Sequence, residues 1–153
     1  MKNKKLFWGT MTILWVIVIF SFSLQPGEVS GNLSGSILEK MLGLFVRVED
    51  LSEAHLELIH TIVRKCAHFT EFMILGVFAG LTVSNTKCMK GFLMAFCFCL
   101  VIASADETLQ LFIDGRAGRI VDVLIDCSGS AYGLFLPFLH LLINNGGHTK
   151  ATI

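Results

Sequence analysis

The sequence predicts an all-α fold: a four-helix transmembrane bundle with an additional amphipathic interfacial helix between the first and second crossings. The chain of 153 residues is 54% hydrophobic and only 16% charged, whereas an ordinary soluble domain carries about 25% charged residues. Four apolar runs are long enough, or nearly so, to cross about 30 Å of hydrocarbon. Adjacent carboxylates, Asp106 and Glu107, interrupt the third run, where each costs roughly 2.5–3.5 kcal/mol at a helix centre. Two acids in such a place need partners or a function.

Composition limits the classes of protein that fit. At this length we expect one domain, residues 1–153. The formal net charge is zero and no basic cluster is interleaved with stacking aromatics, so we expect no nucleic-acid partner. The five cysteines include no CxxC pair, which indicates neither a disulfide framework nor a zinc site. We interpret all five as small apolar packing residues.

The four crossings follow from the apolar runs. The first covers residues 6–22 and comes after three lysines. Because no A-x-A-like cleavage site follows it, we expect a retained helix rather than a signal peptide. The second covers 67–84, the third 91–112 and the fourth 120–143. Pro137 is expected to kink the last turns of the fourth helix.

The connection over residues 25–66 contains two further helical signals. Apolar residues at helical spacing predict an amphipathic helix on the membrane surface: Leu33, Ile37, Met41, Leu42 and Phe45, with Glu39 and Lys40 opposite. Asp50 and Glu53 have capping-box spacing, which predicts a helix start near Leu51. One helix over 51–84 would span roughly 50 Å, so part of it would stand above the bilayer, or the helix would bend.

Basic residues and the first helix together predict the orientation. Six are expected on each side: Lys2, Lys4, Lys5, Lys87, Lys90 and Lys150 with the N-terminus, and Lys40, Arg47, Arg64, Lys65, Arg116 and Arg119 opposite. The first helix breaks this tie, because it usually dominates and three lysines precede it. We also expect function to retain Arg64, Lys65 and Arg116. The prediction is a multi-pass protein of the cell membrane with both termini in the cytoplasm.

Under this topology, polar side chains from four separate segments lie at one membrane face, the outer one. On the second helix, Arg64, His68 and Glu71 follow i, i+4, i+8, i+11 spacing from His60 and so share one helical face, with Lys65 a little round from them. The candidate site residues are Ser23 and Gln25 after the first crossing, Arg64, Lys65, His68 and Glu71 on the second, Asp106, Glu107 and Gln110 on the third, and Arg116, Asp122 and Asp126 around the start of the fourth.

Two GxxxG spacings bear on whether these residues meet. They lie at 76–80 in the second crossing and 129–133 in the fourth. Small residues at this spacing let helices approach closely in lipid. If these two helices touch, Asp126 comes near Glu71 or His68. The same spacing is common in membrane helices without any such contact, so both interpretations stay open.

Three blocks of the chain match known motifs. IFSFSLQPG (19–27) looks like an end-of-first-helix motif, and RKCAHFTEFMILG (64–76) like a K-x-x-H-f-x-x-aromatic block that places Lys65, His68 and Phe72. DETLQLFIDGRAGRIVDVLIDCSGSAYG (106–133) looks like a D-E-x-x-Q block followed by R, D and D/N-x-x-G. In this order they resemble the VanZ-like membrane proteins over nearly the whole chain. The family is named for a member associated with resistance to the glycopeptide teicoplanin.

The resemblance implies a role in the cell envelope, with low-level protection against lipid-anchored glycopeptides as one form of it. It does not supply a settled biochemical activity. One departure is Asp114, where members often have proline. This change makes the external turn less rigid and adds a charge, but it leaves the motif residues intact.

The preferred function is binding of an amphipathic ligand in a polar pocket. The ligand would be a lipid headgroup, a lipid-linked cell-wall precursor or a lipoglycopeptide, and membrane lipids are expected partners. Arg64, Lys65 and Arg116 would engage its phosphate or carboxylate. The other ligand-binding candidates are Ser23, Gln25, Glu71, Gln110 and Asp122.

The alternative is a membrane hydrolase or group transferase acting on a lipid-linked substrate. His68 would be the general base or acid, supported by Asp106, Glu107 and Asp126. For any single pair, a structural ion pair is the simpler interpretation, but the set exceeds what holding four helices together requires.

A third possibility is a hard divalent cation on carboxylates and His68: Glu71, Asp106, Asp122 and Asp126. The nearby basic residues argue against it, because they would already neutralise the acids. We therefore expect no metal and no cofactor.

Overall fold

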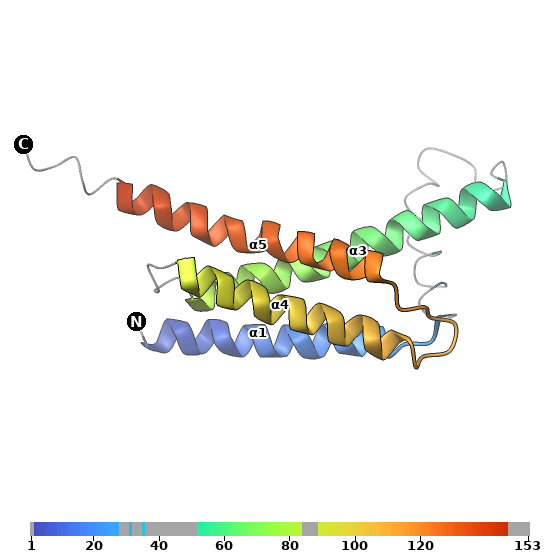
Figure 1. Cartoon of the computed structure of the whole chain (residues 1–153), viewed down its shortest axis with the longest axis horizontal. Helices are drawn as coiled ribbons and strands as arrows, with labels where there is room; N and C mark the ends of the chain where they lie inside the picture. The colour runs from blue at the N-terminus through green and yellow to red at the C-terminus, as the bar shows by residue number, and fades with distance from the viewer. Residues whose placement is uncertain (1, 28–30, 32–34, 36–51, 84–88, 147–153) are drawn as a thin grey trace, which may run out of the picture.

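A computed structural model of the chain describes residues 2–27, 31, 35, 52–83 and 89–146, with side chains as far as residue 139. Within this part there are four helices and no strand (Figure 1): α1 (Lys2–Ser23), α3 (Glu53–Val83), α4 (Met89–Gln110) and α5 (Ile120–Gly146). Each is long and apolar enough to cross a membrane. The predicted all-helical fold, with four helices of membrane-spanning length, is confirmed. The amphipathic helix predicted over residues 33–45 lies outside the described residues and gains no support.

The helix α3 runs unbroken over 31 residues, close to the single helix predicted over 51–84. Its start differs slightly from the prediction. The carbonyl of Ser52 accepts hydrogen bonds from the backbone N–H groups of His55 (2.9 Å) and Leu56 (3.1 Å), so Ser52 is the residue at the helix boundary. The capping-box partner Asp50 lies outside the described residues.

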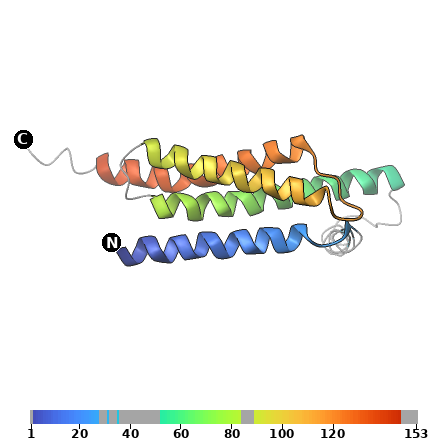
Figure 2. The same cartoon turned by 60° about the horizontal axis from the view of Figure 1, so that its bottom comes forward.

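The bundle has two distinct ends. The start of α1 and the end of α5 lie at one end, whereas α1 and α4 finish and α5 begins at the other (Figures 1 and 2). The N-terminal part of α3 extends beyond its neighbours at that second end, which we call the loop end (Figure 1). Because neighbouring crossings run in opposite directions, residues far apart in sequence are placed at the same level.

Helices α3 and α5 form the most extensive contact in the bundle, and glycines make it possible. A Cβ added to Gly76 would overlap the backbone of Ser130, and one added to Gly129 or Gly133 would overlap the backbone of α3. Of the two interpretations of the GxxxG spacings, close helix packing is confirmed. This contact sets the first turns of α5 directly against the middle of α3.

Pro137 lies inside α5, which continues past it to Gly146. The proline is buried. A Cβ added to Gly80 would meet the Cγ of Pro137 at 3.1 Å, so the glycine of α3 makes room for the proline ring of α5.

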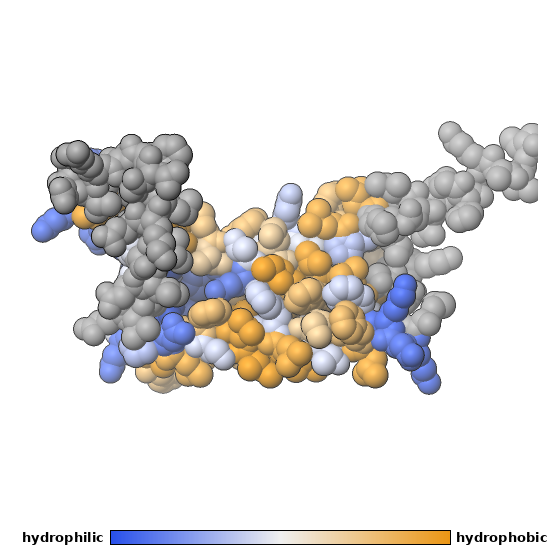
Figure 3. Space-filling model, turned by 180° about the vertical axis from the view of Figure 1, so that it is seen from behind, coloured by the Kyte–Doolittle hydropathy of each residue, from blue (hydrophilic) through white to orange (hydrophobic). Residues whose placement is uncertain are grey.

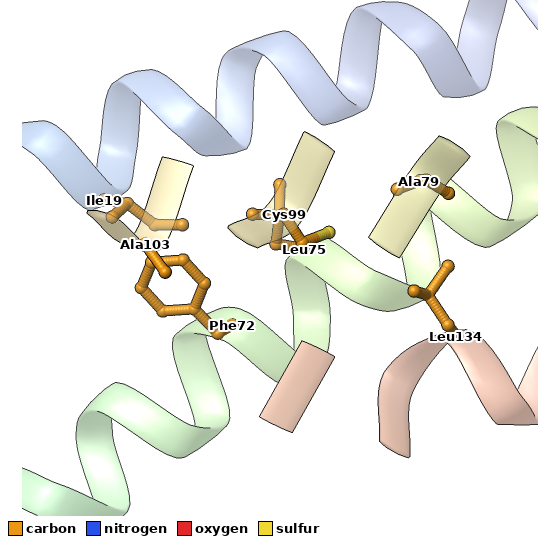
Figure 4. Packing of buried hydrophobic residues seen from close by; sticks show 8 residues of the cluster. Ile19, Phe72, Leu75, Ala79, Cys99, Ala103 and Leu134 are labelled. Carbon is orange, nitrogen blue, oxygen red and sulfur yellow. The ribbon is translucent and has the colours of Figure 1, made fainter. Parts of the chain in front are cut away.

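The apolar core is small and lies between the two ends (Figure 4). It consists of Ile19, Phe72, Leu75, Ala79, Ala95, Cys99, Ala103 and Leu134. Half of these eight residues are alanine or cysteine, which allows the backbones to approach closely, as expected in lipid. The visible surface is largely apolar between hydrophilic residues toward the two ends (Figure 3).

The four described cysteines are free thiols. Cys99 is buried in the core and Cys127 packs against it, so the packing prediction holds for these two. Cys66 and Cys97 are exposed, and for them the prediction was wrong. The fifth, Cys88, lies outside the described residues.

Candidate functional site

Polar residues from all four helices meet at the loop end, as their spacing predicted. Seven of the predicted residues are buried there: Ser23, His68, Asp106, Glu107, Gln110, Asp122 and Asp126. They come from the end of α1, the middle of α3, the end of α4 and the first turns of α5. The apolar core, shown in Figure 4, lies next to them along the helices, on the side away from the loop end.

His68 sits among three carboxylates. Its Nδ1 lies 3.3 Å from Oδ1 of Asp126 and 4.0 Å from Oε1 of Glu107. Potential ligand atoms of His68, Asp106, Glu107 and Asp126 all lie within 4.8 Å of one another, and none of these residues is more than 5% exposed. We call these four residues the His68 cluster.

The inner atoms of the His68 cluster have no hydrogen-bond partner. They are Nδ1 of His68, Oδ1 of Asp106, Oε1 of Glu107 and both carboxylate oxygens of Asp126. The contact between His68 and Asp126 is short enough for an ion pair but is not aligned as a hydrogen bond. Because buried polar side-chain atoms are mostly satisfied in proteins, five open atoms in one place indicate a site rather than structural support alone.

The outer oxygens of two cluster carboxylates are held firmly. Oδ2 of Asp106 accepts a hydrogen bond from Nε2 of Gln110 at 2.9 Å. Oε2 of Glu107 accepts one from the backbone N–H of Arg119 at 2.8 Å. Gln110 is itself positioned by Ser23, whose hydroxyl oxygen accepts from Nε2 at 3.3 Å. Each carboxylate is therefore oriented by one oxygen and presents the other to the cluster.

The basic residues Lys65 and Arg116 bind groups outside the His68 cluster. Lys65 pairs with Asp122, with 3.1 Å between Nζ and Oδ1. Arg116 donates from Nε to the carbonyl of Gln25 (3.2 Å) and from Nη2 to the carbonyl of Phe22 (2.9 Å). Among the residues that the structure describes, no lysine or arginine side chain forms an ion pair with a cluster carboxylate. The expectation that the basic residues neutralise the acids is therefore confirmed for Asp122 but not for the carboxylates of the His68 cluster.

Arg116 and Arg64 are neighbours at the loop end, and both are partly buried. Burial, reinforced by the charge of Arg64, lowers the pKa of the Arg116 guanidinium from its usual value, but an arginine stays charged at physiological pH. Within the described part of the chain, no hydrogen bond or ion pair occupies the Arg64 side chain. The loop end thus has a cationic rim around buried acids.

Two predicted site residues contribute through their backbone. Gln25 provides the carbonyl that Arg116 binds. Glu71 is partly buried, and its carbonyl accepts a hydrogen bond from the indole N–H of Trp15 at 2.8 Å. This bond fixes α1 against α3 just below His68.

Three residues around the site were not predicted from the sequence: Ser130, Arg119 and Trp15. Ser130 is fully buried one turn beyond Asp126, and the i+4 series from Asp122 could have indicated it. Arg119 acts through a backbone N–H and Trp15 through a bond to a backbone carbonyl. Backbone groups carry no signal in the sequence of side chains, so these contacts were not predictable.

An open hollow lies on the other side of α4. It is lined by Ser104, Ala105, Thr108, Leu109 and Phe112. At 100° per residue these positions lie opposite Asp106 and Glu107 on the helix, and most of them are exposed. The hollow is therefore not an entrance to the His68 cluster.

The family model described as VanZ/LLP1 matches residues 8–142. The chain belongs to the VanZ/LLP1 family. The resemblance inferred from the three sequence blocks is thereby confirmed. Comparisons with curated proteins and with solved structures gave no match. The VanZ/LLP1 match extends from α1 into α5 and includes every residue of the His68 cluster.

The chemistry open to this VanZ-family site follows from its side chains. An imidazole beside a carboxylate is suited to proton transfer. The same imidazole nitrogen and the open oxygens of Asp106, Glu107 and Asp126 are also donors of the kinds that hold divalent cations. The partly exposed cations of the rim are suited to phosphate or carboxylate groups.

Proposed function

We propose that this VanZ-family protein binds the polar headgroup of an amphipathic, lipid-linked molecule of the cell envelope at its loop end. The observation that carries the proposal is the set of five unpaired buried atoms of the His68 cluster, which come from α3, α4 and α5. Leaving a buried polar group unsatisfied costs about 1–3 kcal/mol. Packing alone offers no reason to gather several such groups, whereas a ligand site does.

The rim supplies donors for an anionic headgroup. The ammonium of Lys65 has three donors, and Asp122 is the acceptor recorded for it. Arg116 uses Nε and Nη2 on carbonyls, so part of its five-donor fork stays available. Together with Arg64, these groups would bind phosphate or carboxylate, while Asp122 holds Lys65 in place and two carbonyls at the end of α1 hold Arg116.

The proposal places the loop end at the outer membrane face, with both termini in the cytoplasm. A cysteine in the α4–α5 loop tests this orientation. Ala117→Cys suits the test because Ala117 is exposed, whereas Gly115 has φ of 72°, a conformation that disfavours a side chain. In a background without other cysteines, a membrane-impermeant maleimide should label Ala117→Cys in intact cells. Labelling only in inverted vesicles would overturn the orientation.

Lipid analysis of the purified full-length protein tests the binding proposal. We expect a phosphate- or carboxylate-bearing lipid, enriched over the bulk membrane, to co-purify with the wild type. The double variant Arg64→Gln/Lys65→Gln should lose that enrichment. Lys5→Gln, which removes an exposed charge at the opposite end, should keep it. A lipid composition equal to the bulk membrane in all three proteins would contradict the proposal.

A growth assay tests the link to teicoplanin that the family resemblance suggests. Cells that produce the wild type should tolerate a higher teicoplanin concentration than cells that produce Arg64→Gln/Lys65→Gln at equal protein level. Equal tolerance would remove resistance from the proposed role, while the lipid analysis would still decide on headgroup binding.

A second candidate function is hydrolysis or group transfer on a lipid-linked substrate. The specific observation behind it is the distance of 3.3 Å between His68 Nδ1 and Asp126 Oδ1. Asp126 and Glu107 would orient the ring so that its other nitrogen accepts or delivers a proton. The rim cations would stabilise the developing anion.

The variant His68→Asn separates the two candidates. If the protein is an enzyme, this variant should still bind the lipid and should accumulate it uncleaved, so that more co-purifies than with the wild type. Equal amounts of the same intact lipid on both proteins would exclude acid–base chemistry at His68.

A further inference from the structure

We propose that the His68 cluster binds a divalent cation of the first transition row, Mn²⁺ or Zn²⁺. The ligands would be Nδ1 of the histidine and carboxylate oxygens of its three neighbours, Asp106, Glu107 and Asp126. This inference deepens the proposed function and rests on it, since the ion would supply positive charge at the base of the headgroup site.

The spacing of the ligand atoms fits such an ion. Bonds from Mn²⁺ or Zn²⁺ to nitrogen and oxygen measure about 2.0–2.2 Å, which places the ligand atoms of one ion about 3 to 4.4 Å apart. The four candidate atoms lie within 4.8 Å of one another. Closing the difference takes side-chain adjustments of only a few tenths of an ångström.

The hydrogen bonds that orient the carboxylates resemble those that orient metal ligands in proteins. In metal sites, outer hydrogen bonds orient each ligating group. Here Gln110 holds one oxygen of Asp106, and the backbone N–H of Arg119 holds one oxygen of Glu107. In both residues the second oxygen is buried and has no partner. The unpaired Nδ1 of His68 lies 4.0 Å from the unpaired Oε1 of Glu107 and 3.3 Å from the unpaired Oδ1 of Asp126.

The charge balance also favours a cation. Three carboxylates are buried together, while Lys65 pairs with Asp122 and Arg116 binds backbone carbonyls. A carboxylate without a counter-ion is strongly disfavoured in an environment that excludes water. A protonated His68 would balance one charge, whereas a divalent cation balances two and also fills the open ligand positions.

The donor set favours a transition-row ion over Mg²⁺ or Ca²⁺. Magnesium and calcium prefer sets made of oxygen only. An imidazole nitrogen suits zinc and its neighbours, and carboxylates suit manganese. One nitrogen with several carboxylate oxygens is therefore matched to Mn²⁺ or Zn²⁺.

Binding of Mn²⁺ to the full-length protein, purified in detergent and stripped with a chelator, tests the inference. We expect one Mn²⁺ per chain in a titration followed by electron paramagnetic resonance, and displacement by Zn²⁺ but not by equimolar Mg²⁺. Asp106→Asn and Asp126→Asn should each weaken the affinity by about tenfold or more. Asp114→Asn makes the same chemical change on an exposed residue of the α4–α5 loop and should leave the affinity unchanged.

A spectroscopic signature identifies the nitrogen ligand without any variant. Pulsed electron paramagnetic resonance of the Mn²⁺-loaded wild type should show coupling to an imidazole nitrogen. The coupling should disappear in His68→Asn and persist in His55→Asn, which changes an exposed histidine at the start of α3. No stoichiometric Mn²⁺ or Zn²⁺ in the wild type, or a bound ion without imidazole coupling, would overturn the inference.

The outcomes separate this inference from the proposed function. Enrichment of a lipid on a protein that binds neither ion would overturn the metal site alone. A stoichiometric ion with imidazole coupling on a protein without an enriched lipid would overturn headgroup binding alone.

Discussion

The two ends of the bundle bury polar groups in opposite ways. Toward the chain termini, Thr12 donates to the carbonyl of Trp8 at 2.9 Å and lies 3.3 Å from the hydroxyl of Thr82. The hydroxyl of Thr82 can donate either to that of Thr12 or to the carbonyl of Phe78 at 2.9 Å, so both hydroxyls are satisfied within the protein. At the loop end, by contrast, five buried atoms of the His68 cluster have no hydrogen-bond partner among the described residues.

The first kind of polar group holds helices together through hydrogen bonds within the protein. The second kind has no such bonds and is available to a ligand. In lipid, interhelical hydrogen bonds between hydroxyls are a common means of association. Buried carboxylates and an imidazole whose atoms lack hydrogen-bond partners lower the stability of the fold instead. Such groups are often found where function competes with stability. The ion pair of Lys65 with Asp122 beside the cluster is of the first kind, because both partners are satisfied within the protein.

Gly133→Ala should separate α5 from α3 and so disrupt the loop end, and it has the largest expected effect on stability. Its Cβ would overlap the backbone of Met73, so α5 must move away from α3 and take Asp126 from His68. We expect a loss of about 2–3 kcal/mol in the free energy of unfolding, measured by titration with a denaturing detergent. Gly9→Ala is the control, because its Cβ would meet Thr82 at an ordinary 3.8 Å. Equal effects of the two changes would contradict close α3–α5 packing.

Lys65→Met should show that the closed pair beside the cluster is structural. It leaves the buried carboxylate of Asp122 without a counter-ion. Removing one partner of a fully buried pair costs about 3–5 kcal/mol. The Lys65 side chain is 32% exposed, so solvent screening reduces our expectation to about 1–2 kcal/mol. The double variant Lys65→Met/Asp122→Leu should recover most of the loss. Additive losses in the same unfolding titration would mean that the pair has no structural role.

Arg116→Lys should separate geometry from charge at the rim. The guanidinium binds two carbonyls at the end of α1, and an ammonium cannot reproduce that fork. We expect a loss of about 1 kcal/mol in the free energy of unfolding. Arg119→Lys should change it by less than about 0.5 kcal/mol, because Arg119 acts through its backbone N–H. A loss for Arg119→Lys as large as for Arg116→Lys would contradict these assignments.

Thr12→Val tests the satisfied end and carries the smallest expected effect. It removes the hydrogen bond to Thr82 while keeping the shape of the side chain. Interhelical hydrogen bonds in membrane proteins average about 0.6 kcal/mol, and we expect a loss of that size in the unfolding titration. Thr10→Val is the control, since Thr10 is exposed and bonds only to its own helix. An equal loss in the free energy of unfolding for Thr10→Val would mean that the hydrogen bond between the helices contributes nothing to stability.

Hydropathy and spacing predicted much of this architecture. The four apolar runs gave the crossings, and the placement of Asp106, Gln110 and Asp126 near helix ends gave the polar loop end. Both predictions depend on residue type and periodicity, which the sequence displays directly. The glycine spacings were ambiguous until the α3–α5 contact showed which backbone each glycine faces.

The pairing of individual atoms was not predictable. Arg116 was expected to neutralise acids, but it binds carbonyls of the α1 terminus. Lys65 pairs with Asp122 rather than with the cluster. Both outcomes depend on helix rotation and on backbone acceptors, which a pattern of side chains does not specify. Basic residues were expected to neutralise the acids and so to exclude a metal; Lys65 does so for Asp122, whereas in the described part of the chain no basic side chain pairs with the carboxylates of the His68 cluster.

The most direct test is the free energy of unfolding of Asp126→Asn, compared with that of the wild type in the absence of divalent cations. Asp126 is fully buried, and neither of its oxygens has a hydrogen bond to lose. If the open atoms exist for a ligand, the variant should be as stable as the wild type or more so, while its lipid enrichment and Mn²⁺ binding disappear. A destabilisation of about 2 kcal/mol or more, with ligand binding retained, would show instead that the His68 cluster holds the bundle together.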